Sequence, residues 1–464
     1  SFVTRDGLEM GRAQVAQAEA AGLLPMVAMN PVLLKPTGNA CSQVIIDGRP
    51  VGNMSAREYH KGYALQAFDA VKRALGELDR AYDTLVIEGA GSPAEINLKD
   101  HDIVNMRVAK YLGAPVLLVA DIDRGGSLAA LVGTLELLDP DERDLVKGLV
   151  INKFRGDVSL FTPAIDFLKK KTDKPVLGVV PYVDALGIDE EDSVSLDDRE
   201  QRPEADKVSI AVVQVPKISN FTDFDSLARE DDVALYYARH PRDLAGADAV
   251  ILPGSKNTTE DLCFLLEQGW DRALQHFISQ GKPVIGICGG YQMMGQAVCD
   301  PDQTESQLGR VEGLHLLGVT TTFVSHKLTS QVTADCRDLP FAGTILKAKG
   351  LTGYEIHMGR TERDGSDTYP FVVTSRSGEP CESLAGAARK DGLAWGTYIH
   401  GIFDNDAFRR QFLNALRIRR GWQPMPVTLH YRQEKEAKYD RLARIVRESL
   451  DMKRLRQIME EGIK

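Results

Sequence analysis

The chain has 464 residues, of which 43% are hydrophobic and 26% charged, and its formal net charge is −10. This composition is ordinary for a globular protein, and the length predicts two or three domains. The acidic balance without a basic cluster argues against a nucleic-acid partner. Neither a run of about 20 apolar residues nor a signal peptide is evident, so we expect a cytoplasmic protein without a membrane partner.

The cysteines are scattered, and none forms a C-x-x-C pair. This pattern favours a reducing compartment over a disulfide framework or a zinc site. The six are Cys41, Cys263, Cys288, Cys299, Cys336 and Cys381.

Two series of strands and helices follow one another along the chain. The first has a helical pattern at residues 56–78 and apolar strands at 83–88, 115–121, 148–152 and 175–180. After an acidic, linker-like stretch at 184–207, the second begins at Val208 and continues with strands at 248–252, 283–287 and 393–399. Buried strands alternating with helices predict an α/β fold with parallel sheets. We therefore expect domains at 1–206 and 207–425, then a helical tail at 426–464.

The segment 282–295, KPVIGICGGYQMMG, places Cys288 between an apolar strand and a helix-compatible stretch. This is a G-x-C-x-G form of the nucleophile elbow, in which small neighbours permit a sharp turn. The helix N-terminus after the cysteine favours the thiolate and offers backbone N–H groups to an oxyanion. A buried cysteine before a glycine turn is the alternative.

Two later segments support a catalytic role for this cysteine. Residues 248–258, DAVILPGSKNT, run from a strand into a Pro-Gly turn whose amides around Gly254 would complete an oxyanion hole. Residues 396–404, GTYIHGIFD, place His400 near the end of a strand, where it could take the thiol proton and later protonate ammonia. A structural or solvated histidine is the alternative.

Together, the elbow, the Pro-Gly loop and the late histidine resemble class I glutamine amidotransferases. The resemblance implies that Cys288 attacks the glutamine amide, that Gly254 and Gly289 form the oxyanion hole, and that Gln292 binds glutamine at the C-x-G-x-Q position. Most members carry H-x-E, whereas this chain has Ile402 in place of the glutamate. That departure matches the cobyric acid synthase branch and implies a Cys–His pair.

Nearly the whole chain, in its order of segments, resembles the cobyric acid synthase family. The matching segments are SFVTRDGLEMGRAQVAQAEAA, MNPVLLKPT, EGAGSP, VADIDRGGS, INKFRGD and YEIHMGRT. Membership implies a P-loop-type synthetase domain of the dethiobiotin-synthetase kind. That domain uses ATP to activate the b, d, e and g carboxylates of adenosylcobyrinic acid a,c-diamide, and ammonia from glutamine converts them to amides in cobalamin synthesis.

Within the first domain, Glu88 and Asp121 end predicted strands, where α/β sheets bind ligands. A carboxylate at Glu88 could hold Mg²⁺ near phosphates. Arg124 could meet phosphate or substrate carboxylates, and Asn152 and Lys153 resemble a nucleotide contact. Ordinary Gly-rich or solvated turns are the alternative.

In the segment YEIHMG, Glu355 and His357 are candidate substrate or interdomain residues. Polar side chains alternating on a strand are the alternative.

A P-loop of the form G-x-x-x-x-G-K-[ST] does not occur in the sequence. In the resembling family it precedes the segment with which this chain begins. We therefore expect an N-terminally truncated synthetase domain that hydrolyses glutamine poorly or without coupling and makes no amides.

Two other functions remain open. Cobyrinic acid a,c-diamide synthase shares both domain types, although the RDG-x-E-x-GRAQ and NPVLLKPT segments argue against it. A non-enzymatic paralogue that binds a corrinoid or nucleotide fits the absent P-loop but not Cys288 and His400. The oligomeric state is not predicted.

Overall fold

The computed structural model describes residues 1–38, 41–59, 63–184, 186–188 and 203–462. Contacts divide the chain into two units. The first unit holds 1–39, 47–51 and 189–434, and the second holds 40–46, 52–188 and 435–464. In this division residues 1–39 group with the second α/β series, whereas the sequence boundaries placed them with the first series.

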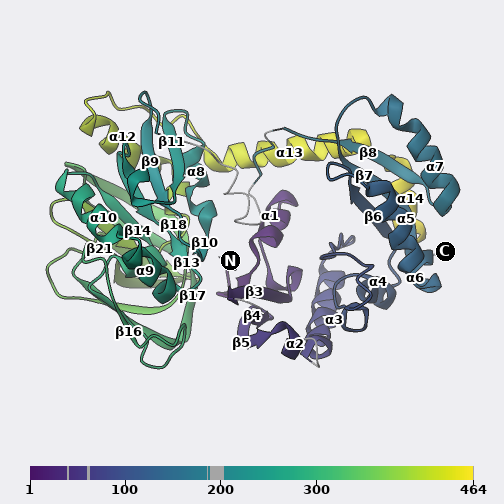
Figure 1. Cartoon of the computed structure of the whole chain (residues 1–464), viewed down its shortest axis with the longest axis horizontal. Helices are drawn as coiled ribbons and strands as arrows, with labels where there is room; N and C mark the ends of the chain where they lie inside the picture. The colour runs from purple at the N-terminus through teal and green to yellow at the C-terminus, as the bar shows by residue number, and fades with distance from the viewer. Residues whose placement is uncertain (39–40, 60–62, 185, 189–202, 463–464) are drawn as a thin grey trace. The chain divides into compact units, whose positions relative to one another are not determined.

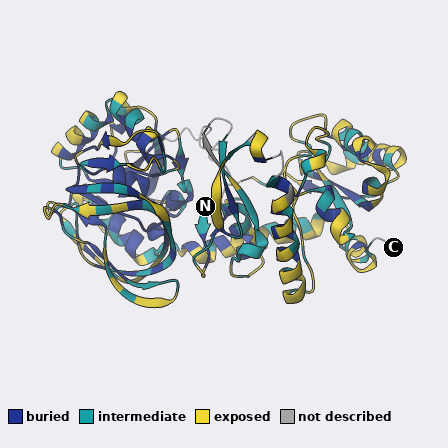
Figure 2. Cartoon of the chain, turned by 90° about the horizontal axis from the view of Figure 1, so that it is seen from below, coloured by how far each residue is buried: buried dark blue, intermediate teal, exposed yellow. Residues whose placement is uncertain are grey.

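A six-stranded sheet with the order β11-β9-β12-β14-β22-β21 forms the centre of the first unit (Figure 1). Its pairs are parallel except β21–β22. Every residue of β9 is buried, as expected for a central strand covered on both faces. Figure 2 shows how strongly burial concentrates in these strands. The strands are β9 (Val208–Val213), β11 (Val233–Ala238), β12 (Ala249–Leu252), β14 (Val284–Ile287), β21 (Ala387–Ala388) and β22 (Ala394–Thr397).

Helices of the first unit other than α1 pack on this sheet through apolar faces. In α10, Trp270, Leu274, Phe277 and Ile278 recur at helical spacing and are buried, so they form one apolar face. At the start of α9, the Asn257 side chain accepts a hydrogen bond from the Glu260 N–H and caps the helix. The helices are α1 (Arg12–Ala20), α8 (Asp225–Ala228), α9 (Thr258–Glu267), α10 (Trp270–Ser279), α11 (Gly289–Met293) and α12 (Asp406–Arg419).

A second, largely antiparallel sheet in this unit was not predicted from the sequence. Its order is β16-β15-β17-β19-β20, and β18 also pairs with β17. A short hairpin, β1–β2, and a short antiparallel pair, β10–β13, are separate from it. The strands are β1 (Phe2–Val3), β2 (Glu9–Met10), β10 (Ile218–Ser219), β13 (Gly254–Ser255), β15 (Ala297–Cys299), β16 (Arg310–Glu312), β17 (Val319–Phe341), β18 (Thr344–Arg363), β19 (Phe371–Arg376) and β20 (Glu379–Ala385).

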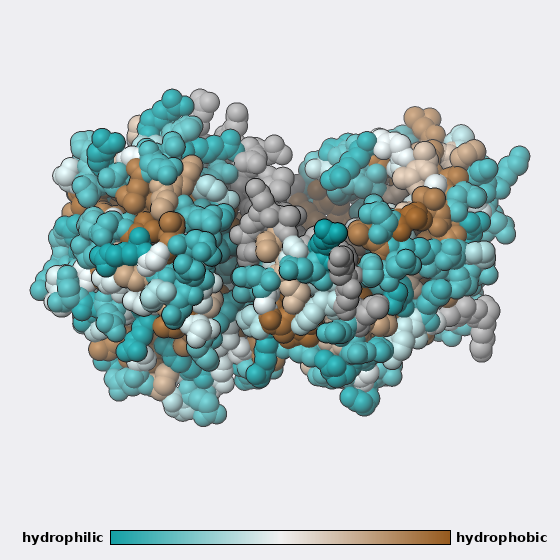
Figure 3. Space-filling model, turned by 60° about the horizontal axis from the view of Figure 1, so that its bottom comes forward, coloured by the Kyte–Doolittle hydropathy of each residue, from teal (hydrophilic) through white to brown (hydrophobic). Residues whose placement is uncertain are grey.

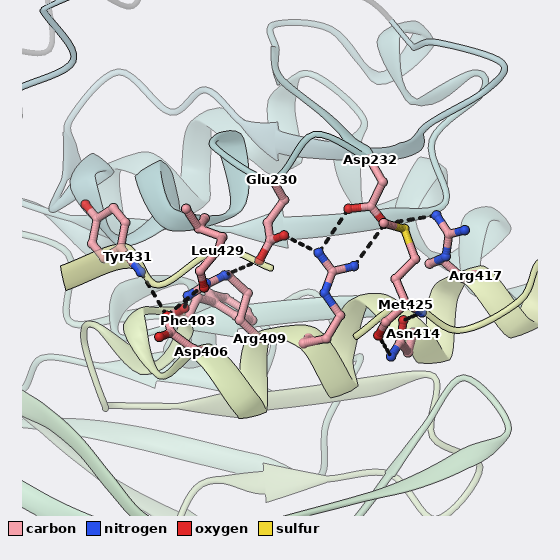
Figure 4. A network of polar contacts seen from close by, with 11 residues as sticks. Glu230, Asp232, Phe403, Asp406, Arg409, Asn414, Arg417, Met425, Leu429 and Tyr431 are labelled. Atoms are coloured by element: carbon pink, nitrogen blue, oxygen red, sulfur yellow. Dashed lines mark hydrogen bonds and ion pairs between the residues drawn. The ribbon is translucent and has the colours of Figure 1, made fainter. Parts of the chain in front are cut away.

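A buried ionic network joins α12 to the segment around β11 (Figure 4). Arg409 is fully buried, and its guanidinium donates to Glu230 and to two backbone carbonyl groups. Arg410 forms ion pairs with Glu230 and Asp232. Buried charges are tolerated because each one here has an oppositely charged partner.

The second unit contains a parallel sheet with the order β6-β7-β8. The prediction of two α/β domains with parallel sheets is therefore confirmed. Its strands are β6 (Val116–Asp121), β7 (Val146–Phe154) and β8 (Val176–Pro181). A further three-stranded sheet has the order β3-β4-β5, and its strands are β3 (Val32–Gly38), which belongs to the first unit, β4 (Cys41–Ile46), which belongs to the second, and β5 (Arg49–Ser55), which is divided between them. The helices of the second unit are α2 (Ala56–Glu58), α3 (Ala64–Ala81), α4 (Met106–Leu112), α5 (Ser127–Leu137), α6 (Pro140–Leu145), α7 (Thr162–Thr172) and α14 (Met452–Glu461).

Helix α13 (Tyr431–Ser449) begins in the first unit and ends in the second. The predicted helical tail at 426–464 thus contains two helices, α13 and α14. Ile458 of α14 is buried in a cluster with Val150, Leu177 and Val180 of the β7–β8 region. The last part of the predicted helical tail is therefore packed against a sheet.

The prediction of a strand at 83–88 is wrong. These residues have no regular structure, and the Val86 side chain is 94% exposed. A strand forms when a neighbour pairs with its backbone groups, and no described strand pairs with this run. Other large apolar side chains also reach the surface, including Ile87, Leu160 and Phe167, and Figure 3 shows hydrophobic residues exposed on one face of the molecule.

The acidic linker predicted at 184–207 lies mostly outside the described residues. Among the described helices, none combines the length and apolar character needed to cross a membrane.

Candidate active site

Cys288 lies at the turn between β14 and α11, as the elbow pattern predicts. Its φ is 51°, a left-handed value that costs energy for a residue with a side chain. The glycines beside it are needed for close packing, because a Cβ at Gly286 would lie 2.7 Å from the Tyr291 backbone nitrogen, and one at Gly290 would overlap the Leu252 carbonyl group. The turn therefore holds the thiol in one direction.

The thiol of Cys288 is 8% exposed and faces both a strand of the second sheet and a histidine. Its Sγ lies 3.6 Å from the carbonyl oxygen of Ile356 in β18. It is also within hydrogen-bonding reach of the imidazole of His400. The structure thus brings together the predicted nucleophile and base from positions 112 residues apart.

The imidazole of His400 is buried and fixed by two neighbours. Its Nδ1 lies 2.7 Å from Oδ2 of Asp223, and its ring stacks on Tyr354 with centroids 5.0 Å apart. Residues 354 and 400 also exchange backbone hydrogen bonds of 2.9 and 3.2 Å. These contacts leave Nε2 for the thiol.

Asp223 corrects the expectation of an unsupported Cys–His pair. Ile402 does occupy the glutamate position of H-x-E, but the carboxylate comes from a turn 177 residues earlier. Its Oδ1 also accepts a hydrogen bond from the Gly401 N–H. Because NFTDFD matches no motif around His400, the sequence offered no signal for this contact.

The electrostatics around His400 favour the imidazolium ion. Burial opposes the charged form, but the charge of Asp223 and then that of Cys288 outweigh burial, and together they raise the pKa of His400 to about 10. A protonated base next to a thiolate is the state that can later donate a proton to a leaving group.

The two glycines proposed for the oxyanion hole lie beside this pair. A Cβ on Gly254 would be 3.5 Å from Cε1 of His400, and one on Gly289 would be 2.8 Å from the Ser255 nitrogen. The Pro-Gly loop and the elbow are thus adjacent. Their oxyanion role stays a prediction.

Gln292, one turn after the nucleophile, is buried and already bonded within the protein. Its Oε1 accepts from the Thr258 hydroxyl group at 3.1 Å, and its Nε2 donates to the Tyr398 oxygen at 3.2 Å. Binding of glutamine by this side chain stays a prediction. The contacts show that it also ties α9 and α11 to the segment after β22 that carries His400.

Glu355 and His357 lie on β18, on either side of Ile356, whose carbonyl group faces Cys288. The Glu355 carboxylate forms an ion pair with Arg376. His357 donates from Nδ1 to the Gly359 carbonyl group and stacks on Tyr398, and burial lowers its pKa to about 4. Both residues have partners in the first unit, and their predicted substrate or interdomain role is untested.

Sequence reasoning missed the β1–β2 hairpin, which docks on the strands bordering the site. Three residues at alternate positions of β17 face it: Lys327 contacts Glu9, Thr329 donates to the Gly7 carbonyl group, and Gln331 donates to that of Val3. On β18, Tyr354 and Ile356 pack with Val3. The hairpin therefore supports the two residues that contact His400 and Cys288.

The buried carboxylate of Glu9 holds this hairpin. It lies 2.6 Å from Lys327 and 3.2 Å from Lys35. Burial alone would raise the pKa of Glu9, but the two lysines hold it well below its usual range. Burial lowers the pKa of Lys327, whereas the charge of Glu9 and its hydrogen bond raise it, so the carboxylate stabilises the charged ammonium.

We expect Glu9→Gln to loosen the hairpin, because it leaves two lysines facing a neutral amide at a cost of about 3 kcal/mol. Amide hydrogen exchange within residues 1–10 should accelerate by on the order of 10²-fold, the equivalent of that energy. The exposed Glu362→Gln in β18 is the matched control, and the double variant Glu9→Gln with Lys327→Met should recover part of the protection. Unchanged exchange in Glu9→Gln would show that the Glu9 carboxylate does not hold the hairpin in place.

In the second unit, three predicted site residues meet at the carboxyl ends of neighbouring strands. Asp121 of β6 is in register with Asn152 of β7, and the Lys153 ammonium lies 2.8 Å from the Asp121 carboxylate. Lys153 has a φ of 61°, so the strand is strained at the point where the lysine turns toward Asp121. This is the edge where α/β sheets bind ligands.

The remaining two predicted residues of this unit lie on irregular backbone. Arg124 follows β6 in a turn with Gly125 and Gly126, both at positive φ. Glu88 does not end a strand, which corrects the expectation, because residues 83–88 lack a pairing partner. Among the described residues, no group of three or more His, Cys, Asp or Glu side chains is arranged to hold a metal.

Comparison with known proteins gives two matching families. Residues 209–408 match a CobB/CobQ-like glutamine amidotransferase domain, and residues 53–189 match an AAA domain. The chain is 52% identical over 462 residues to a cobyric acid synthase of Moorella thermoacetica, covering 99% of this chain and 89% of the relative. It is 54% identical to one of Pelotomaculum thermopropionicum (91% and 80%) and 47% identical to one of Salmonella arizonae (99% and 90%).

Proposed function

The chain belongs to the cobyric acid synthase family, and from this premise we propose that the full gene product uses ATP and glutamine to amidate the b, d, e and g carboxylates of adenosylcobyrinic acid a,c-diamide. The observation that carries the proposal is the buried Cys288 at a strained elbow, within reach of an imidazole that a carboxylate holds. That arrangement suits attack on an amide, and the relatives are named for the corrinoid product.

In the proposed glutaminase step, His400 takes the thiol proton and the Cys288 thiolate attacks the side-chain amide of glutamine. Amides near Gly254 and Gly289 stabilise the oxyanion. His400 then gives the proton to the departing ammonia, which leaves a glutamyl thioester, and water hydrolyses the thioester to glutamate. The high pKa of His400 suits the second proton transfer.

In the proposed synthetase step, ATP converts a corrinoid carboxylate to an acyl phosphate, and ammonia displaces the phosphate to give an amide. Asn152 and Lys153 would contact the nucleotide, and Arg124 would contact a phosphate or carboxylate. Asp121 and Glu88 offer the oxygen ligands that Mg²⁺ prefers, and the side chain of Asp121 is 30% exposed and ion-paired with Lys153. When bound, Mg²⁺ neutralises phosphate charge.

The test supplies the full gene product with ATP, the corrinoid and glutamine labelled with ¹⁵N in its side-chain amide. We expect mass spectrometry to show ¹⁵N in four corrinoid amides. One glutamate should be released for each amide formed. Cobyrinic acid is the comparison substrate. Labelling of that acid at two positions instead would point to a,c-diamide synthesis, and labelling of neither corrinoid would overturn the proposal.

A further inference from the structure

The general base, His400, is hydrogen-bonded to a buried carboxylate. The H-x-E pattern does not supply this carboxylate, because Ile402 stands at the glutamate position. Asp223 lies in a 3-10 turn, Phe221–Phe224, after β10, whereas His400 follows β22. The Asp223 and His400 side chains are 5% and 1% exposed. We infer that Asp223 is the positioning residue of the glutaminase site, fixing the tautomer of His400 and stabilising its imidazolium ion.

The tautomer follows from the hydrogen bonds. A carboxylate only accepts, so His400 Nδ1 must carry the hydrogen on the 2.7 Å contact. In the neutral ring, Nε2 is then the unprotonated nitrogen that faces Cys288 and takes the thiol proton. Without the carboxylate, the ring could place its hydrogen on Nε2 and lose its function as a base.

The carboxylate itself is held in place. Its second oxygen accepts from the Gly401 N–H at 3.1 Å, and the N–H of Asp223 donates to the Asn220 carbonyl group at 2.9 Å. Stacking on Tyr354 fixes the plane of the imidazole. The acid, the base and the nucleophile are therefore aligned before glutamine binds, which is how preorganised sites lower barriers.

Other ionisable groups also face His400 and would shape its titration. They are Cys288 on the elbow, Tyr354, Glu355 and His357 on β18, and Asp223 itself. Glu355 is ion-paired with Arg376, and His357 is neutral near pH 7 because burial lowers its pKa to about 4. Asp223 and Cys288 are the two of these groups that hydrogen-bond to the ring, Asp223 at Nδ1.

In the formation of the thioester the proton count balances without any further reactant, and the later hydrolysis of the thioester consumes one water. The thiol proton moves to Nε2, the thiolate forms the carbon–sulfur bond, and the same proton then leaves with the amide nitrogen as ammonia. Throughout, the Nδ1 hydrogen stays between His400 and Asp223. Removing the carboxylate should destabilise the imidazolium, so the pH at which His400 loses its proton should fall.

The experiment measures glutamate release against pH for the wild type, Asp223→Asn, Asp223→Glu and Asp367→Asn. Asp367 is a buried carboxylate that accepts from the Gly318 N–H, away from His400, and serves as the matched control. For Asp223→Asn we expect kcat to fall by on the order of 10²- to 10⁴-fold with a smaller change in KM. We also expect its alkaline limb to move down by at least about one pH unit.

Asp223→Glu retains the carboxylate, so its alkaline limb should stay within about half a pH unit of the wild type. Asp367→Asn should match the wild type throughout. A wild-type rate and profile in Asp223→Asn would overturn the inference. If Asp223→Asn does not fold, as judged by circular dichroism, the pH profile of Asp223→Glu becomes the test. An alkaline limb at the wild-type pH supports the positioning role of Asp223, and a limb shifted to lower pH overturns it.

This inference rests on the glutaminase half of the proposed function. Glutamate release needs no corrinoid, so failure to amidate the corrinoid would overturn the proposed substrate alone. The effect of the Asp223 variants on glutamate release would still be measurable.

Discussion

In the full gene product, replacing Cys288 by serine is expected to abolish amide formation from glutamine while leaving amide formation from added ammonia intact. A serine hydroxyl at this elbow is a far weaker nucleophile than a thiolate paired with His400. The loss in glutamine-dependent kcat should be on the order of 10³-fold or more, as for removal of other catalytic nucleophiles. Added ammonia bypasses the thioester, so the synthetase half should still work.

The assay compares corrinoid amidation with glutamine and with ammonium chloride at mildly alkaline pH. Cys263→Ser is the matched control, because Cys263 is another free cysteine of the first unit, half-buried in α9. That variant should match the wild type with both nitrogen donors. Glutamine-dependent turnover that survives in Cys288→Ser would remove Cys288 from the mechanism.

Replacing Arg409 by methionine is expected to cause the largest loss of stability in the first unit. The guanidinium donates to Glu230 at 2.7 Å and to Asp406 and the carbonyl groups of Phe403 and Leu429 at 2.9 Å (Figure 4). Methionine restores much of the volume but leaves these buried acceptors without their donor. Breaking a buried charge pair from one side costs about 3–5 kcal/mol.

Urea unfolding followed by tryptophan fluorescence measures this effect, because the three tryptophans, Trp270, Trp395 and Trp422, all belong to the first unit. Arg419→Met is the matched control on the same helix. Arg419 is exposed and donates to one carbonyl group, so its loss should stay within about 0.5 kcal/mol. Equal midpoints for the two variants would show that the network adds no stability.

Several features of the fold could be read from the sequence because they are local. The apolar runs at 115–121, 148–152 and 208–213 became strands, since a continuous apolar segment of that length suits a strand covered on both faces. The run at 83–88 has the same character but no pairing partner among the described strands. A strand depends on its neighbour as well as on its own residues.

The candidate site divides in the same way. Cys288 and the glycines around it form one contiguous segment, and the turn geometry follows from those residues alone. Asp121 and Asn152 lie in register because the ends of adjacent parallel strands meet at one edge. Their role with a nucleotide stays a prediction.

The sequence by itself determined the nucleophile elbow, the strand that precedes His400 and the α/β character of both units, because each depends on residues that are neighbours in the chain. Only the tertiary structure decided which carboxylate supports His400 and which segment supports β17 and β18 beside it. Asp223 meets His400 across 177 residues, and Glu9 meets Lys327 across 318. No spacing rule links such positions, because the folded backbone and the burial of charge select these partners.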